Sequence, residues 1–219
     1  MKTSDKGIAF IVAHEGIVPG PYLDSVGVWT YGIGHTASAG APNPATMPRG
    51  MPLDLDEELQ KVFALFRSDL AKFEARVNRR LGGKIVPQHQ FDAAVSFDFN
   101  TGWIDRAKWV EAWIEGRVGA ASMSMVQNFR KPAEIIERRE AEGRLLASGD
   151  YGSKTAAVWQ VNGKGGVIWK PVRTLTPAQI VALMRPSTWT EPTKTPAKPV
   201  AAGGLSALIA WLVSIFSRR

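Results

Sequence analysis

The sequence predicts an α+β fold that is mostly helical and carries a small β-sheet near the N-terminus. Apolar residues recur at helical spacing in a first segment that ends at Glu15, and again in a long segment that starts near residue 54. Between them, in residues 22–35, aromatic and β-branched residues alternate with glycines, which is typical of a hairpin sheet with tight turns. Apolar residues make up 45% of the 219 residues, enough for a packed core.

The first predicted helix places a carboxylate at its C-terminal end. Ser4 or Asp5 can cap the helix, and Gly16 is a natural stop. Glu15 shares a helix face with the apolar residues Ile8, Ile11 and Val12. An ionised acid is unfavourable at this position, because both the helix dipole and the loss of water oppose a negative charge.

The rest of the chain reads mainly as helices. Asp54 and residues 56–58 open the long helix, whose apolar positions continue to Val77. Further helices are expected at about 87–99, 108–115, 119–128 and 133–147, and a short one from Thr176 or Pro177 to near Met184. Residues 156–161 and 167–172 are strand-like runs on either side of an expected hairpin turn.

Composition narrows the classes of partner. The net charge of +7 favours a polyanion, whether nucleic acid, cell-wall polymer or membrane surface. The sequence lacks zinc-finger spacing, an aromatic RNA-binding signature and a basic heptad region, so no nucleic-acid partner is expected. Cysteine is absent, which excludes disulfides and thiol catalysis. His14 is not followed by a second histidine at zinc-protease spacing, and neither a metal nor a cofactor is expected.

Two carboxylates and a hydroxyl form the sharpest constellation of reactive residues. Asp24 lies nine positions after Glu15, and Thr30 follows on the same hairpin, so a reversal at 16–20 would bring all three across a cleft. Hydrolysis of a glycosidic bond needs a protonated carboxylic acid for the leaving oxygen and an ionised carboxylate for the water or for the charge on the sugar. Glu15 suits the first role, Asp24 on its polar turn suits the second, and Thr30 could hold the water. The spacing alone is weak evidence, since a surface glutamate and a turn aspartate give it by chance.

Several long motifs resemble the phage lysozyme family, and they occur in that family's order. They are HEG at 14–16, YLD at 22–24, WTYGIGHT at 29–36, Asp69 and Leu70 with Phe73, Glu74 and Val77, QFDAAVSFDFNTG at 90–102, and IERREAE at 136–142. The resemblance covers about residues 5–150.

The resemblance implies a two-lobed, lysozyme-like fold with a long connecting helix. It implies cleavage of the β-1,4 bond between N-acetylmuramic acid and N-acetylglucosamine, typically with inversion. It assigns Glu15 as general acid, Asp24 as the water-orienting carboxylate and Thr30 as its neighbour. Three further residues would line the cleft: Thr36, Phe99 and Asn100. With inversion we expect the two carboxyl groups to lie about 6.5–9.5 Å apart.

Other chemically suggestive residues also have a structural interpretation. His35 is expected to be a structural histidine, paired with Asp69 on the long helix, rather than a catalytic group. Arg138, Arg139 and Glu142 read equally well as substrate-binding charges or as a salt-bridged helix surface supporting the cleft wall. Tryptophans can stack on sugars, but those at positions 29, 103, 109 and 113 lie amid apolar residues and are expected to pack.

The chain divides into four parts. Residues 1–150 form the lysozyme-like catalytic domain, 151–186 an extension with the hairpin and short helix, 187–199 a proline-rich linker and 200–219 an apolar tail. The hairpin could pack on the C-terminal lobe or bind wall polymer, and its apolar strands favour packing. The tail could lie on a membrane or anchor shallowly in it, span it, or dock on the enzyme or on a second copy. Its apolar stripe, followed by two arginines, favours the membrane surface.

The sequence therefore predicts a monomeric peptidoglycan hydrolase for host-cell lysis. No signal peptide is recognised, so we expect synthesis in the host cytoplasm and action on the periplasmic cell wall after release, with dependence on a holin left open. One rival is a lytic transglycosylase, which cleaves the same bond without water and usually needs only an acidic glutamate. Asp24 and Thr30 disfavour it. The other is a membrane-disrupting or wall-binding protein acting through the tail, which the intact carboxylates disfavour as the sole function.

Overall fold

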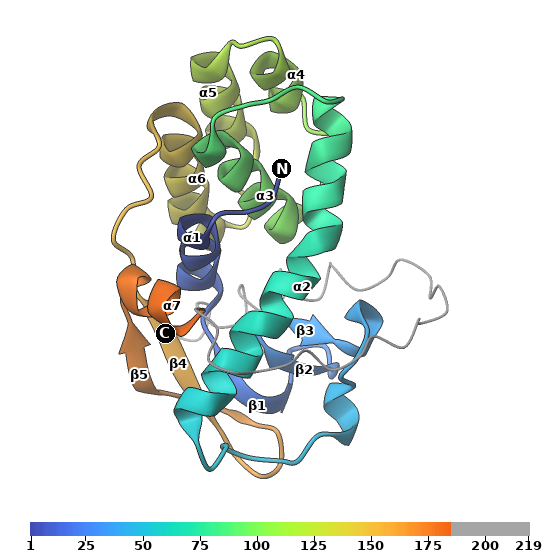
Figure 1. Ribbon diagram of the computed structural model, residues 1–219, viewed down its shortest axis with the longest axis vertical. Coiled ribbons are helices and arrows are strands. Elements are labelled where there is room, and N and C mark those ends of the chain that lie inside the picture. Colours follow the sequence, from blue (N-terminus) through green and yellow to red (C-terminus); the bar gives the residue numbers. More distant parts are fainter. Residues whose placement is uncertain (185–219) are drawn as a thin grey trace. The chain divides into compact units, whose positions relative to one another are not determined.

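The computed structural model describes residues 1–184, whose helices and strands are traced in Figure 1. Within these residues, seven α-helices accompany a three-stranded and a two-stranded antiparallel sheet, so the fold is α+β as predicted. The described chain forms two compact units. The helical unit comprises residues 1–11 and 70–152, and the sheet unit comprises residues 12–69 and 153–184. The predicted linker at 187–199 and tail at 200–219 lie outside the described residues.

Two helices contribute residues to both units: α1 spans Asp5–Glu15, and the long helix α2 spans Leu55–Leu81. The predicted start of α2 is confirmed, because Asp54 Oδ1 accepts hydrogen bonds from the backbone N–H groups of Asp56 (2.9 Å) and Glu57 (3.0 Å). These bonds satisfy two of the donors that a helix N-terminus leaves unpaired. No helix within residues 1–184 combines the length and apolar character needed to cross a membrane.

The sheet unit is built on a small meander of three strands in the order β1-β2-β3. In this meander Tyr22 lies opposite Thr30, and Thr30 lies opposite Thr36. Directly opposed residues of antiparallel strands project to the same face of the sheet. The strands are β1 Val18–Leu23, β2 Trp29–Gly32 and β3 His35–Thr36, and the following loop holds 3₁₀ turns at Ala37–Ala39 and Pro44–Thr46.

The predicted hairpin at 156–172 belongs to the sheet unit, so the expectation that it packs on the C-terminal lobe is wrong. Ile17, just before β1, forms a parallel bridge with Val158, and both side chains are fully buried. The N–H of Leu23 donates to the carbonyl of Gly165 at 2.9 Å. Residues 153–184 are therefore part of this unit rather than an appendage. Their elements are β4 Ala156–Val161, β5 Val167–Leu175 and α7 Pro177–Leu183.

The helical unit is organised around one buried helix, α3, which spans Gln88–Thr101 and buries every side chain from 90 to 100. The Phe97 ring meets Trp109 and Phe129 edge-on, at centroid distances of 5.1 and 4.8 Å. Trp103 was expected to pack, but it is 50% exposed because it follows the left-handed Gly102 that ends α3. The other elements are α4 Trp109–Ile114, α5 Val118–Asn128, a 3₁₀ turn at Ala133–Ile135 and α6 Ile136–Ser148.

Candidate active site

Glu15 is the last residue of α1, and its side chain is only 6% exposed. Gly16 follows with φ of 75°, a left-handed conformation that favours glycine, and its N–H donates to the carbonyl of Val12 at 2.9 Å. The N–H of Ile17 then donates to the carbonyl of Ala157 in β4 at 2.9 Å. The carboxyl group thus lies at a helix end whose continuation is fixed by a strand.

Asp24 organises the turn between β1 and β2. Its Oδ1 accepts hydrogen bonds from the backbone N–H groups of Val26 (3.0 Å) and Val28 (2.8 Å), and its own N–H donates to the carbonyl of Val28 at 3.0 Å. The side chain is partly exposed. One carboxylate oxygen, Oδ1, therefore accepts both side-chain hydrogen bonds of the turn, and the Asp24 carboxylate remains accessible to solvent.

Thr30 is tied to the same turn from the other side. Its hydroxyl donates to the carbonyl of Val28 at 3.2 Å, and its side chain is almost fully buried. Asp24 and Thr30 are thus joined through Val28, whose N–H donates to Asp24 and whose carbonyl accepts from Thr30. Together with Glu15, these predicted catalytic residues all lie in the sheet unit.

Tyr22 is a neighbour of this group to which the sequence assigned no role. Burial, reinforced by the negative charges of Asp24 and Glu15, raises the pKa of its phenol well above the usual value near 10. Both carboxylates therefore act on the same phenol. Its position two residues before Asp24 was the available sequence clue, and the structure adds that it lies opposite Thr30.

The residues expected to bind substrate do not share one unit. Thr36 lies opposite Thr30 in the sheet unit, with its hydroxyl 2.8 Å from that of Ser38. Phe99 and Asn100 lie at the end of α3 in the helical unit, and both are buried. The Phe99 ring lies 4.9 Å from that of Phe73. Lining of the substrate site by these residues stays a prediction.

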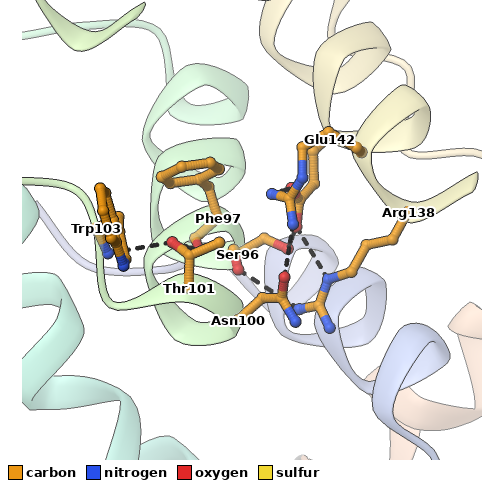
Figure 2. A network of polar contacts seen from close by, with 8 residues as sticks. Ser96, Phe97, Asn100, Thr101, Trp103, Arg138 and Glu142 are labelled. Carbon is orange, nitrogen blue, oxygen red and sulfur yellow. Dashed lines mark hydrogen bonds and ion pairs between the residues drawn. The ribbon is translucent and has the colours of Figure 1, made fainter. Parts of the chain in front are cut away.

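Figure 2 shows a buried network at Arg138 and Glu142, for which the sequence left substrate-binding charges and a salt-bridged helix surface equally open. Glu142 accepts hydrogen bonds from the hydroxyl of Ser96 (2.7 Å) and from Arg138 Nε (3.0 Å), and it also pairs with Arg139. Arg139 Nη2 donates in turn to Asn100 Oδ1 at 2.5 Å. Burial lowers the pKa of Arg139, although Glu142 opposes this. The alternative of an exposed helix surface is wrong because α6 packs on α3 and α5, which cover these charges, and a substrate-binding role stays a prediction.

His35 forms the pair with Asp69 that the sequence predicted, with 2.8 Å between Nδ1 and Oδ2. Its Nε2 lies 2.8 Å from the carbonyl oxygen of Pro42, so both ring nitrogens are engaged in structural contacts. In the part of the chain that the structure describes, no group of three or more His, Cys, Asp or Glu residues is arranged to hold a metal ion.

A separate pocket of about 690 Å³ lies within the sheet unit. Its walls come from the loop after β3 and from the first turns of α2, and Tyr31 contributes its hydroxyl, which donates to Glu58 at 2.6 Å. Glu15, Asp24 and Thr30 are not among its lining residues. The pocket is therefore distinct from the candidate catalytic group.

Comparison with known proteins connects the chain to a family. The model of the family described as Phage lysozyme matches residues 12–142. The chain is similar to the SAR-endolysin of Haemophilus phage HP1, with 32% identity over 101 residues, which are 46% of this chain and 48% of that protein. It is also similar to the SAR-endolysin of Escherichia phage P1, with 28% identity over 102 residues, 47% of this chain and 49% of that protein. The chain thus spans about half the length of the curated relatives it matches.

The chain is also similar in structure to solved proteins with related names. The muramidase domain of SpmX from Asticaccaulis excentricus is 28% identical with a TM-score of 0.53, covering 67% of this chain and 98% of that one. The endolysin from Escherichia coli O157:H7 phage FAHEc1 is 25% identical with a TM-score of 0.56, covering 69% of this chain and 97% of that one. Both similarities extend over nearly the whole length of the compared chain.

Proposed function

The chain belongs to the phage lysozyme family, and from this premise we propose that it hydrolyses the β-1,4 bond between N-acetylmuramic acid and N-acetylglucosamine in peptidoglycan. The observation that carries the proposal is that the matched residues 12–142 include Glu15, Asp24 and Thr30, held on one helix end and one hairpin of the same unit. The similarity to proteins named as a muramidase domain and as endolysins supports a wall-glycan substrate.

In the proposed reaction, Glu15 donates its proton to the glycosidic oxygen as the bond to the anomeric carbon breaks. A water attacks the opposite face of the sugar, and Asp24 takes its proton. The Thr30 hydroxyl already donates its hydrogen to Val28, so towards this water it acts as an acceptor. Before it attacks, the water therefore donates one hydrogen bond to Asp24 and the other to Thr30. This arrangement points an oxygen lone pair at the anomeric carbon and gives inversion.

The decisive experiment is digestion of purified peptidoglycan by the wild type, by Glu15→Gln and by the exposed-site control Glu111→Gln, with mass spectrometry of the products. We expect water-added reducing ends from the wild type and the control and almost none from Glu15→Gln. Anhydro products would instead identify a transglycosylase. Proton magnetic resonance of the first products would test inversion, since an inverting enzyme releases the α-anomer from a β-linked glycan.

For the biological role, we propose an endolysin that reaches the periplasmic wall after release from the host cytoplasm. The names of its relatives, SAR-endolysins, support this role. Residues 200–219 are proposed to contact the membrane surface, since 200–216 contain no charged residue and Arg218 and Arg219 follow. Sedimentation with anionic vesicles should bind the wild type more strongly than a variant carrying Leu208→Asp and Leu212→Asp. Equal binding would argue against the tail as the contact.

A further inference from the structure

The β4–β5 hairpin lies beyond the residues 12–142 that the family model matches, yet it contacts the chain immediately after Glu15. Ile17 is held by β4 through both backbone groups. Its N–H donates to the carbonyl of Ala157 at 2.9 Å, and its carbonyl accepts from the N–H of Trp159 at 2.8 Å. The bridge to the fully buried Val158 completes this junction. The segment that follows the proposed general acid is thus clamped by a strand from the other end of the described chain.

The side chain of Trp159 lies beside this junction, where the register of β4 with β5 shifts between Val158 and Trp159. A Cβ atom built on Gly16 would lie 2.8 Å from Trp159 Nε1, so the indole occupies the space beside the residue that follows Glu15. Trp159 is itself half-buried, and the Trp169 ring of β5 packs edge-on against it, with centroids 5.3 Å apart. The indole is therefore held from two sides.

The last turn of a helix lacks the continuing hydrogen bonds of its interior and frays easily. A general acid at that position must nevertheless stay within a few tenths of an ångström of its productive place, because a displacement of about 1 Å can cost about 100-fold in rate. At Glu15 the helix end is followed by a left-handed glycine, which is the most permissive residue in the backbone. The contacts of Trp159 and β4 restrict the chain at this point.

We propose that Trp159, carried by the β4–β5 hairpin, is a positioning residue for Glu15, holding the C-terminal end of α1 through Gly16 and Ile17. The proposal rests on the proposed function, because it assigns Trp159 to the same proton-donation step. It predicts that the hairpin sets turnover rather than substrate affinity.

The test compares Trp159→Ala, Trp159→Phe and wild type in steady-state kinetics on soluble glycan fragments. The matched control is Trp103→Ala, which removes a half-exposed tryptophan from the helical unit. We expect Trp159→Ala to lower kcat by about 10- to 100-fold with KM changed less than about twofold, and Trp159→Phe to recover most of the loss. Should Trp159→Ala not fold, Trp159→Leu takes its place, since it keeps apolar bulk without the flat ring.

Amide hydrogen exchange at Gly16 and Ile17 supplies a readout that does not depend on activity. Exchange at these two amides should accelerate in the alanine or leucine variant and not in the Trp103 control. Unchanged exchange and a kcat equal to that of the control would overturn the positioning role while leaving the proposed function intact. A loss confined to KM would overturn it as well. A folded wild type that does not cleave the glycan would overturn the proposed function itself.

Discussion

His35 Nδ1 lies 2.8 Å from Asp69 Oδ2, while the other ring nitrogen lies 2.8 Å from the carbonyl oxygen of Pro42. Both ring nitrogens are therefore held by oxygen atoms, one from α2 and one from the loop after β3. Since His35 is 2% exposed, the pair links β3 to α2 in the interior of the sheet unit.

We expect His35→Ala to lower the free energy of unfolding by about 3 kcal/mol, because removing one partner of a buried pair leaves the other uncompensated. Arg79→Ala is the control, since its pair with Asp105 is exposed and should contribute about 1 kcal/mol or less. Urea unfolding followed by circular dichroism measures both. A His35→Ala effect no larger than that of the control would contradict a structural role for the pair.

Glu142→Gln tests the buried network of the helical unit. The amide has nearly the same size, but it removes the only carboxylate that faces both Arg138 and Arg139 in the described network. Both buried guanidinium groups would then lose the carboxylate that they share, and we expect a loss of about 3–5 kcal/mol in the free energy of unfolding.

Glu140→Gln is the matched control, because Glu140 lies on the same helix in an exposed pair with Arg130. Its change should cost less than about 1 kcal/mol. Thermal melting of the two variants under identical conditions compares them directly, and similar melting temperatures would mean that the network contributes little to stability.

The contrast between these two glutamates shows where prediction from the sequence stops. Both follow Arg138 and Arg139 within one helical turn or slightly more, and only the packing of α6 on α3 and α5 decides that Glu142 is buried. The helices themselves were predictable, since their apolar periodicity is local. For example, α3 was expected at 87–99 and lies at Gln88–Thr101. Burial of a charge depends on neighbours distant in sequence, which periodicity does not encode.

The residues of the candidate site also fall into a set that the sequence predicts locally and one residue that depends on contacts distant in the sequence. Glu15, Asp24 and Thr30 lie on consecutive elements, so their common unit follows from one helix stop and one hairpin. The place of Trp159 beside the site could not be predicted from the sequence, because its contact with Gly16 joins positions 143 residues apart. That contact depends on the pairing of Ile17 with β4. The hairpin itself was predicted from its two apolar strand-like runs and the glycines between them, but the strand edge on which it packs was not.

Asp24→Asn separates the charge of this residue from its role in the turn. The amide oxygen of asparagine can still accept the bonds from Val26 and Val28, so the hairpin should keep its conformation. The variant cannot take a proton from water, and we expect turnover to fall by about 100- to 10,000-fold. Kinetics on glycan fragments and melting temperature should be measured together.

Asp24→Ala is the companion variant, since it loses both the charge and the turn bonds. It should melt at a lower temperature than Asp24→Asn while showing a similar loss of turnover. An asparagine variant with nearly full activity would exclude Asp24 as the base, whatever the stability of the hairpin.

The three tyrosines of the chain provide a test of the structure at alkaline pH. Burial raises the pKa of Tyr22, Tyr31 and Tyr151, with further contributions from Asp24 and Glu15 at the first, Glu58 at the second and Asp92 at the third. A phenol in the unfolded chain titrates near 10. Above that pH the folded state binds more protons than the unfolded state, so the stability that the three groups contribute is fully present below about pH 10 and is lost as the pH rises through their folded values.

We therefore expect the native protein to show little phenolate absorbance up to about pH 11, whereas the protein in concentrated urea titrates all three phenols near pH 10. At higher pH, phenolate should appear together with the loss of near-ultraviolet circular dichroism, because ionisation and unfolding are coupled. Tyr31→Phe serves as the control, since it removes one chromophore and the Tyr31–Glu58 hydrogen bond and should reduce the coupled absorbance change by about one third. A native protein whose phenols titrate reversibly near pH 10 without unfolding would contradict the raised pKa values of these phenols, and with them the position of Tyr22 beside the two carboxylates.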